Sequence, residues 1–172
     1  IITTNMIKLL LAILLNQGLL FSQSLDLKLE KSIGGIDAKP KYEFSDSIYL
    51  HSTDKGNKLK FYDYRVAVLI TNTSDKKMTG IRLRYDIKLN IKKDDNIYRT
   101  VSLYSSSLRI SEIKSNKSKK IYIYDLKNVF PEIHRFLNAG YTPYEVVIDI
   151  MKEPKKGEDY VFYSFPFAVS FK

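Results

Sequence analysis

The sequence predicts an all-β fold: an antiparallel β-sandwich of about seven to nine strands with one short helix. Three observations predict this class. Apolar and polar residues alternate with a period of two along most of the chain after residue 24, which is the pattern of strands with one face in a core and one in water. The breaks between these stretches are short and rich in Asp, Asn, Gly and Pro, as in strand connections. Only the segment 127–139 has the spacing of an amphipathic helix.

The N-terminal segment comes first in chain order. Lys8 precedes a run of apolar residues, and the small residues Ser22 and Ser24 follow that run. A cation, an apolar run and small residues at a cleavage site are typical of a secretory signal peptide. The run is interrupted before it reaches the roughly 20 apolar residues that a transmembrane helix needs. We therefore expect residues 1–24 to hold upstream residues and a signal peptide, cleaved after Ser24, and residues 25–172 to form one domain without a transmembrane segment.

The sequence contains no cysteine. An exported chain without cysteine forms no disulfide bonds, so its hydrophobic core alone must stabilise it. The thiol-linked lipid anchor of bacterial lipoproteins is excluded for the same reason. The 148 residues after the signal peptide are enough to bury such a core. We expect a protein exported by a bacterium, to the periplasm or to the extracellular medium.

The predicted strands follow the signal peptide. The clearest is 81–91, where Tyr85 and Ile87 fall on the apolar face and Arg84 and Lys88 on the polar face. A slip of one residue would bury the charges, so the two faces of this strand are well specified. The strands are predicted at 25–30, 48–52, 62–71, 81–91, 97–104, 120–125, 145–151 and 161–171.

The helix is predicted over 127–139. Apolar residues such as Ile133 recur on one of its faces, Pro131 lies near its start and Gly140 lies just after its end. Proline is tolerated in the first turn of a helix and glycine just past its end. The stretch 31–45 is predicted to be the longest irregular segment.

Residues 66–74, followed by 81–86, resemble the central hairpin of exported immunoglobulin-like modules of the FxLYD kind. In those modules one strand ends in an Asn-x-Ser-type turn, here Asn72-Thr73-Ser74, and the next strand carries a Tyr-Asp pair, here Tyr85-Asp86. Arg84, between Leu83 and Tyr85, departs from the pattern. The resemblance implies an immunoglobulin-like β-sandwich and a non-enzymatic module of the envelope or cell surface.

Residues that carry catalysis are few. The two histidines, His51 and His134, lie far apart in sequence, and neither has a second ligand at metal-binding spacing. Gly34-Gly35 lacks the spacing of a phosphate-binding loop. Asp94-Asp95-Asn96 fits a polar hairpin turn better than a calcium loop, because the alternating acidic ligands are missing. We expect no enzyme activity, no catalytic residue, no metal and no cofactor.

The net charge of the chain is +9. A basic exported protein favours an anionic partner, such as lipid headgroups, an acidic glycan or a cell-wall polymer. Of the 28 cationic residues, 22 are lysine and six are arginine. Because nucleic-acid sites use the arginine fork more heavily, we expect no nucleic-acid partner. The alternative is that the lysines reflect genome composition alone.

Tyrosines supply the first candidate contact surface. If Ile121 and Ile123 face the core, the tyrosines next to them in sequence face outward. Exposed tyrosines on adjacent strands stack on sugar rings or anchor a protein partner. The alternative is that another segment covers them. The candidates are Tyr98, Tyr104, Tyr122 and Tyr124.

Lysines supply the second candidate surface. Alternate loops of an antiparallel fold lie at the same end, so loops 72–80, 112–120 and 152–158 are expected to meet there, and we call this end the lysine pole. Nine lysines against four acidic residues give it a charge of +5. The alternative is that these lysines only solvate turns and protect strand edges. The nine are Lys76, Lys77, Lys114, Lys117, Lys119, Lys120, Lys152, Lys155 and Lys156.

Two functions are consistent with these observations. The first is a non-enzymatic, exported interaction module, such as an envelope accessory subunit, with an unknown protein partner. The second is a protein that binds a glycan or an anionic envelope component through the tyrosines or the lysine pole.

Overall fold

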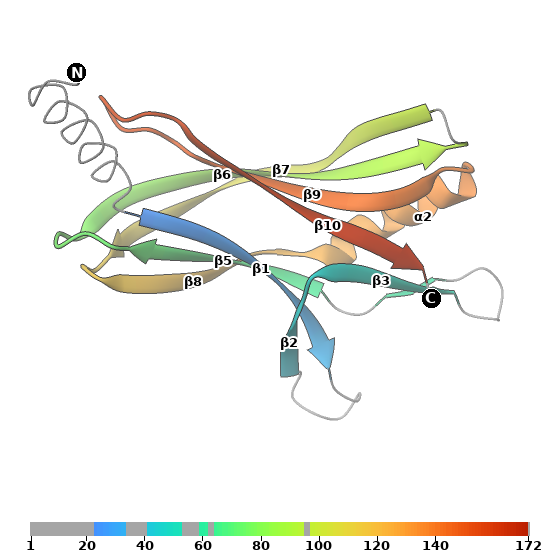
Figure 1. Cartoon of the computed structure of the whole chain (residues 1–172), viewed down its shortest axis with the longest axis horizontal. Coiled ribbons are helices and arrows are strands. Elements are labelled where there is room, and N and C mark those ends of the chain that lie inside the picture. The colour runs from blue at the N-terminus through green and yellow to red at the C-terminus, as the bar shows by residue number, and fades with distance from the viewer. Residues whose placement is uncertain (1–22, 34–40, 53–58, 62–63, 95–96, 172) are drawn as a thin grey trace, which may run out of the picture.

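The computed structural model describes residues 23–33, 41–52, 59–61, 64–94 and 97–171. Two β-sheets pack face to face, and a short helix lies at one end of them (Figure 1). The elements are β1 (Gln23–Ile33), β2 (Lys41–Ser45), β3 (Ser47–Ser52), β4 (Leu59–Phe61), β5 (Tyr64–Asn72), β6 (Met78–Lys93), β7 (Ile97–Ile113), β8 (Lys117–Asp125), η1 (Leu126–Val129), α2 (Phe130–Asn138), β9 (Thr142–Lys152) and β10 (Val161–Phe171). The predicted class, an all-β sandwich with one short helix, is confirmed.

Sheet A has four strands in the order β2-β1-β5-β8, and sheet B has six in the order β4-β3-β10-β9-β6-β7. Neighbouring strands are antiparallel except β3 and β10, which pair in parallel with Ile48 opposite Val169. The described residues thus form ten strands, more than the seven to nine predicted. β2 lies in the stretch that we predicted to be irregular. Ser45 is its only buried residue, so it has no apolar face for the sequence to reveal.

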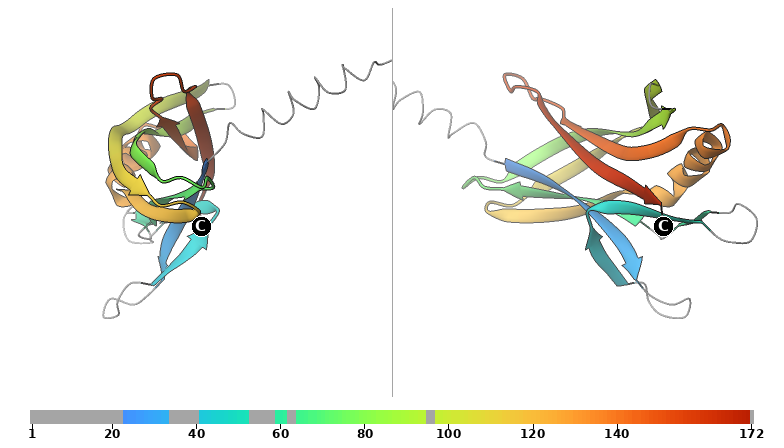
Figure 2. Two further views of the ribbon diagram at one scale, coloured as in Figure 1. Left: turned by 90° about the vertical axis from the view of Figure 1, so that its left-hand side faces the viewer. Right: turned by 45° about the vertical axis from the view of Figure 1, so that its right-hand side comes forward.

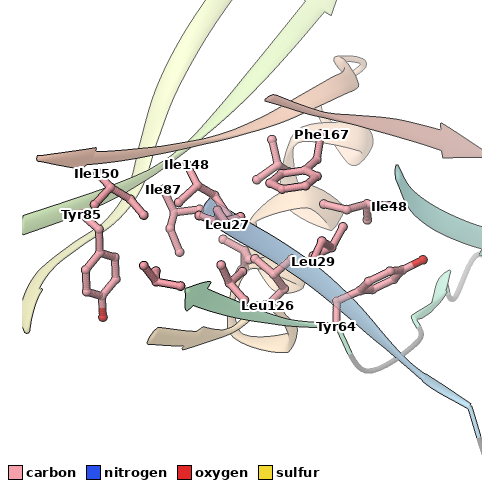
Figure 3. Close-up of a cluster of buried hydrophobic side chains, with 14 of the residues drawn as sticks. Leu27, Leu29, Ile48, Tyr64, Tyr85, Ile87, Leu126, Ile148, Ile150 and Phe167 are labelled. Carbon is pink, nitrogen blue, oxygen red and sulfur yellow. The ribbon is translucent and has the colours of Figure 1, made fainter. Parts of the chain in front are cut away.

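The core lies between the sheets (Figure 3). β1 and β5 contribute residues such as Leu29 and Val68, and they meet Ile87 and Ile148 from sheet B. The prediction for the strand 81–91 is confirmed: Tyr85 and Ile87 are buried, whereas Arg84 is exposed and Lys88 half-exposed.

The buried apolar residues of this core run from Leu27 to Val169 among the residues that the structure describes. A chain that starts at Leu25 keeps all of them, and it keeps seven of the nine residue pairs between β1 and β5. The predicted mature chain 25–172 therefore contains the whole described core.

The predicted helix is present as η1 followed by α2. The α2 residues Phe130 and Ile133 are buried, and Pro131 lies in the first turn of the helix. Gly140 adopts φ +79° just after the helix and donates its backbone N–H to the carbonyl of Leu137 at 2.9 Å. Glycine meets this left-handed conformation without strain, which explains why the helix ends here. Among the described residues, no helix is long and apolar enough to cross a membrane.

β7 extends to Ile113, well past the predicted end at 104. Its pairing with β6 shifts register between Ile87 and Lys88, because Ile87 lies opposite Tyr104 and Lys88 opposite Ser102. Leu103 is the extra residue of this β-bulge. The side chains that follow it in β7 therefore lie on the face opposite to the one that strict alternation from Ile97 predicts.

Candidate functional site

The structure separates the candidate tyrosines. Tyr122 is 49% exposed on the outer face of sheet A, and Tyr98 is 62% exposed on the outer face of sheet B, next to Tyr144. Strict alternation along the predicted strand 97–104 places Tyr104 on the same outward face as Tyr98, and this is wrong, although the side chain is 38% exposed. The bulge turns it toward the inner face of sheet B, where its ring centroid lies 6.1 Å from that of Tyr85. The side chain of Tyr124 lies outside the described residues, so the tyrosines form no single surface that the structure describes.

A cluster that the sequence did not reveal lies around Arg65, near the start of β5 on the outer face of sheet A. The central carbon of its guanidinium group lies 3.2 Å from the ring centroid of Tyr42, on β2, and 4.0 Å from that of Tyr122, on β8. Because β2 and β8 lie on opposite sides of β5 in the sheet, the two rings sandwich the guanidinium group. Stacking on aromatic faces is a property of the planar guanidinium that lysine lacks.

Hydrogen bonds fix the same arginine. Nε of Arg65 donates to Oε2 of Glu30 at 3.0 Å, and Nη2 donates to the hydroxyl oxygen of Tyr122 at 2.9 Å. The ammonium group of Lys120 donates to the other carboxylate oxygen, Oε1 of Glu30. We call Glu30, Tyr42, Arg65, Lys120 and Tyr122 the Arg65 cluster.

Glu30 holds two cations while its side chain is only 10% exposed. Burial alone raises the pKa of a carboxyl group, because it disfavours the charged form. The hydrogen bonds from Lys120 and Arg65 and their positive charges outweigh burial, so the pKa of Glu30 lies below its ordinary value. The hydrogen bond to Glu30 in turn raises the pKa of Lys120. Glu30 and Lys120 therefore both carry their charge at neutral pH.

Apolar residues border the cluster. Phe44 lies directly opposite Glu30 in the β1–β2 register and is 65% exposed. Leu69, half-buried, lies on the same face of β5 as Arg65. The outer face of sheet A thus combines exposed apolar surface with a cation held in one orientation. Alternation places Arg65 and Tyr122 on polar faces, but no pattern in the sequence brings together strands so far apart along the chain.

The lysine pole is formed as predicted, and Asn72 joins two of its loops. This side chain is fully buried, and its Nδ2 donates to the carbonyls of Lys76 at 2.8 Å, Ile113 at 3.2 Å and Lys114 at 3.2 Å. The hydroxyl of Ser115 also donates to the carbonyl of Ser74 at 2.9 Å. The β5–β6 and β7–β8 turns therefore lie against each other.

The β9–β10 loop reaches the same end of the molecule. The backbone N–H of Glu153 donates to the carbonyl of Arg82 at 2.9 Å, and Nζ of Lys155 donates to the carbonyl of Thr79 at 2.6 Å. Figure 1 shows the three connections at one end of the sandwich, opposite α2. The expectation that alternate loops share one end is confirmed.

The nine lysines are not equivalent. Lys120 binds Glu30 in the Arg65 cluster, and its side chain therefore points away from the pole. Lys152 is bound to Glu158 at 2.8 Å, Lys155 donates to a carbonyl, and Lys77 lies 4.0 Å from Glu112. The other five are exposed and make no ion pair with another described residue: Lys76, Lys114, Lys117, Lys119 and Lys156.

A shallow hollow on the outer face of sheet B contains a buried acid, Asp149. Its carboxylate accepts from Nζ of Lys88 at 2.6 Å and from the hydroxyl of Ser164 at 2.7 Å. The hydrogen bond to Asp149 raises the pKa of Lys88. The two charges pair with each other, and Arg84, Asp86, Met151 and Phe162 line the rest of the hollow.

The remaining candidates for chemistry stand apart from these surfaces. Nδ1 of His134 is 3.0 Å from the amide nitrogen of Asn138, and the side chain of His51 lies outside the described residues. Asp94 adopts φ +51°, as in a tight turn. Within the described ranges, no three His, Cys, Asp or Glu side chains gather in a group that could hold a metal ion.

Comparison with known proteins gives little guidance. No family model and no curated protein matches the chain. Among solved structures it is similar to the solution structure of AT1g01470 from Arabidopsis thaliana, with a TM-score of 0.33 and 10% sequence identity over 83% of each chain. A likeness at this level carries no argument about fold or function.

Proposed function

We propose that this chain is a non-enzymatic, exported interaction module, such as an accessory subunit of the cell envelope. We further propose that it binds a protein partner through the Arg65 cluster and Phe44. The observation that carries the proposal is the arginine stacked between Tyr42 and Tyr122, beside a phenylalanine that is 65% exposed.

Preorganisation supports this surface as a binding site. Arginine, tyrosine and phenylalanine are enriched at the centres of protein interfaces. Ordering a long side chain on binding costs about 0.5–1.5 kcal/mol. Contacts with Glu30, Tyr42 and Tyr122 already order Arg65, so a partner gains its hydrogen bonds without that cost.

The geometry favours a protein over a glycan. A sugar ring stacks on the flat face of an aromatic side chain, but Tyr42 and Tyr122 each give one face to Arg65. The contacts described for Arg65 use two of the five N–H groups of its guanidinium. Carboxylate and carbonyl oxygens of a protein partner suit the others, and an apolar side chain suits Phe44.

The test begins with capture of envelope proteins on the chain 25–172, followed by purification of the retained protein and measurement of its dissociation constant. We expect the double variant Phe44→Ser with Tyr122→Ser to weaken binding at least about tenfold, because both side chains lose buried apolar area. Tyr98→Ser, at a ring on sheet B that is 62% exposed, is the control.

Thermal unfolding of each variant verifies that the fold is retained. Equal affinity of the double variant and the wild type would overturn the proposal. A sugar ligand found on a glycan array, with binding lost in Tyr122→Ala, would instead support the glycan alternative.

A further inference from the structure

The lysine pole carries two exposed aromatic residues that the sequence analysis did not include. Tyr160, the residue before β10, is 72% exposed, and Phe162, at the start of β10, is 62% exposed. The connection between β9 and β10 ends at Tyr160, Phe162 follows directly in β10, and the exposed Lys155 and Lys156 lie in the same connection. Figure 2 shows this connection projecting from the sandwich. Lysines and exposed aromatic rings therefore occur together at one end of the molecule.

The N-terminal segment joins the fold at this same end. β1 begins at Gln23, which lies opposite Asn72, and Asn72 ties the loops of the pole together. The 22 residues before Gln23 include the apolar run after Lys8. If the apolar run of the precursor is inserted in a membrane, the chain attaches the folded domain to that membrane at the lysine pole. The helix α2 lies at the opposite end of the sandwich.

We propose that the lysine pole is a docking surface for an anionic lipid bilayer. The five lysines without an ion pair to another described residue meet the lipid headgroups, and Tyr160 and Phe162 enter the interface. Anionic membranes attract basic segments within about one Debye length, roughly 8–10 Å. Aromatic rings are favoured at the boundary between headgroups and acyl chains. The two contributions together give a reversible attachment that is stronger than either gives alone.

This surface is separate from the one proposed for the protein partner. The Arg65 cluster lies on the outer face of sheet A, whereas the pole is formed by loops at the end of both sheets. Docking through the pole leaves the outer face of sheet A accessible. A variant that loses membrane binding can therefore keep partner binding, and the reverse also holds.

The test is co-sedimentation of the chain 25–172 with vesicles. One set is neutral phosphatidylcholine, and in the other about one lipid in three is phosphatidylglycerol. We expect binding to the anionic set only, weakening as salt is added. The variant Lys76→Glu, Lys117→Glu, Lys156→Glu changes one exposed lysine in each loop. It should lose at least about 100-fold in partition coefficient, because each lysine near an anionic surface contributes roughly fivefold and each glutamate adds repulsion.

The matched control is Lys41→Glu, Lys92→Glu, Lys93→Glu, which removes the same charge from the other end of the two sheets. We expect it to bind within about threefold of the wild type, since charges more than a Debye length from the surface are screened. A second variant, Tyr160→Ser with Phe162→Ser, should bind about tenfold more weakly, with an unchanged dependence on salt. Circular dichroism melts verify that each variant is folded.

Three results would overturn the proposal. The first is equal binding of the two vesicle sets, and the second is an equal loss in the pole variant and its control. The third is binding to a soluble acidic polysaccharide with none to the anionic vesicles, which would identify a polymer as the partner.

Discussion

The amide of Asn72 donates a hydrogen bond to the backbone carbonyl of Lys114, 3.2 Å away, and so ties the end of β5 to the turn after β7. The same amide reaches the carbonyl of Lys76, and its oxygen accepts from the backbone and hydroxyl of Ser74. One buried side chain thus satisfies polar groups of two turns, β5–β6 and β7–β8, each of which connects sheet A to sheet B.

Replacing Asn72 by alanine should therefore destabilise the fold by about 1–3 kcal/mol, the cost of leaving buried polar groups without a partner. Urea unfolding of the chain 25–172 measures this loss. Asn116→Gly, in the exposed turn where the native φ is +51°, is the control and should change stability by less than about 0.5 kcal/mol. Equal effects of the two changes would contradict the role assigned to Asn72.

The faces of β6 give a second prediction. Ile87 is fully buried between the sheets, so Ile87→Ala should cost about 2–5 kcal/mol through lost apolar contact and the cavity that remains. Arg84→Ala, three residues earlier on the exposed face, should stay within about 0.5 kcal/mol. Chemical denaturation measures both, and similar losses would mean that the strand is buried on both faces.

Lys88 lies on the polar face of β6, but its amine is bound to Asp149, whose side chain is only 8% exposed. Alternation alone predicts a negligible effect for Lys88→Ala. The structure instead predicts a loss of about 1–3 kcal/mol, because a nearly buried carboxylate loses its charged partner. The double change Lys88→Ala with Asp149→Asn should recover part of the loss, and an absence of recovery in urea unfolding would argue against coupling of the pair.

Glu30 makes stability depend on pH. Its pKa is lower in the folded chain than in the unfolded chain, so the unfolded chain takes up the proton first as the pH falls. The stabilisation is present above the unfolded pKa, near 4.5, and is lost as the pH falls through the folded value. Glu30→Gln should therefore destabilise the fold at pH 7, and the difference from wild type should shrink below about pH 4.5. Unfolding at pH 7 and pH 3 measures this, and a constant difference would contradict it.

Export gives the last prediction. Mass spectrometry of the protein from its native host should find an N-terminus at Leu25, because Ser22 and Ser24 fit a signal-peptidase site. An intact chain that still contains the apolar run after Lys8 would contradict cleavage.

Much of the fold could be predicted from the sequence because burial leaves a periodic trace. β6 has one face in the core and one face in water. The strict alternation of its sequence therefore predicts both the strand and the face on which its residues lie. β7 after Tyr104 was missed because Ser105, Ser106 and Ser107 carry no alternation. The bulge at Leu103 depends on pairing with β6 and leaves no local pattern, so the face of Tyr104 was predicted wrongly.

The candidate sites differ in the same way. The lysine pole follows from strand direction alone, so counting strands was sufficient to bring its loops together. The Arg65 cluster depends on which strands are neighbours in sheet A, because β2, β5 and β8 supply its aromatic and cationic groups. Strand order is set by tertiary packing of the whole chain, and a single sequence does not show it.

The parallel pairing of β3 with β10 has a consequence for the order of folding. β10 is the last strand described, yet it lies inside sheet B, between β3 and β9, with Leu50 opposite Phe171. Contacts between residues so distant in sequence form slowly, because the intervening chain must first lose its conformational freedom. If the chain crosses a membrane from its N-terminus, β3 and β4 arrive on the far side before their partner strand β10. Sheet B is then completed only after Phe171 has been translocated.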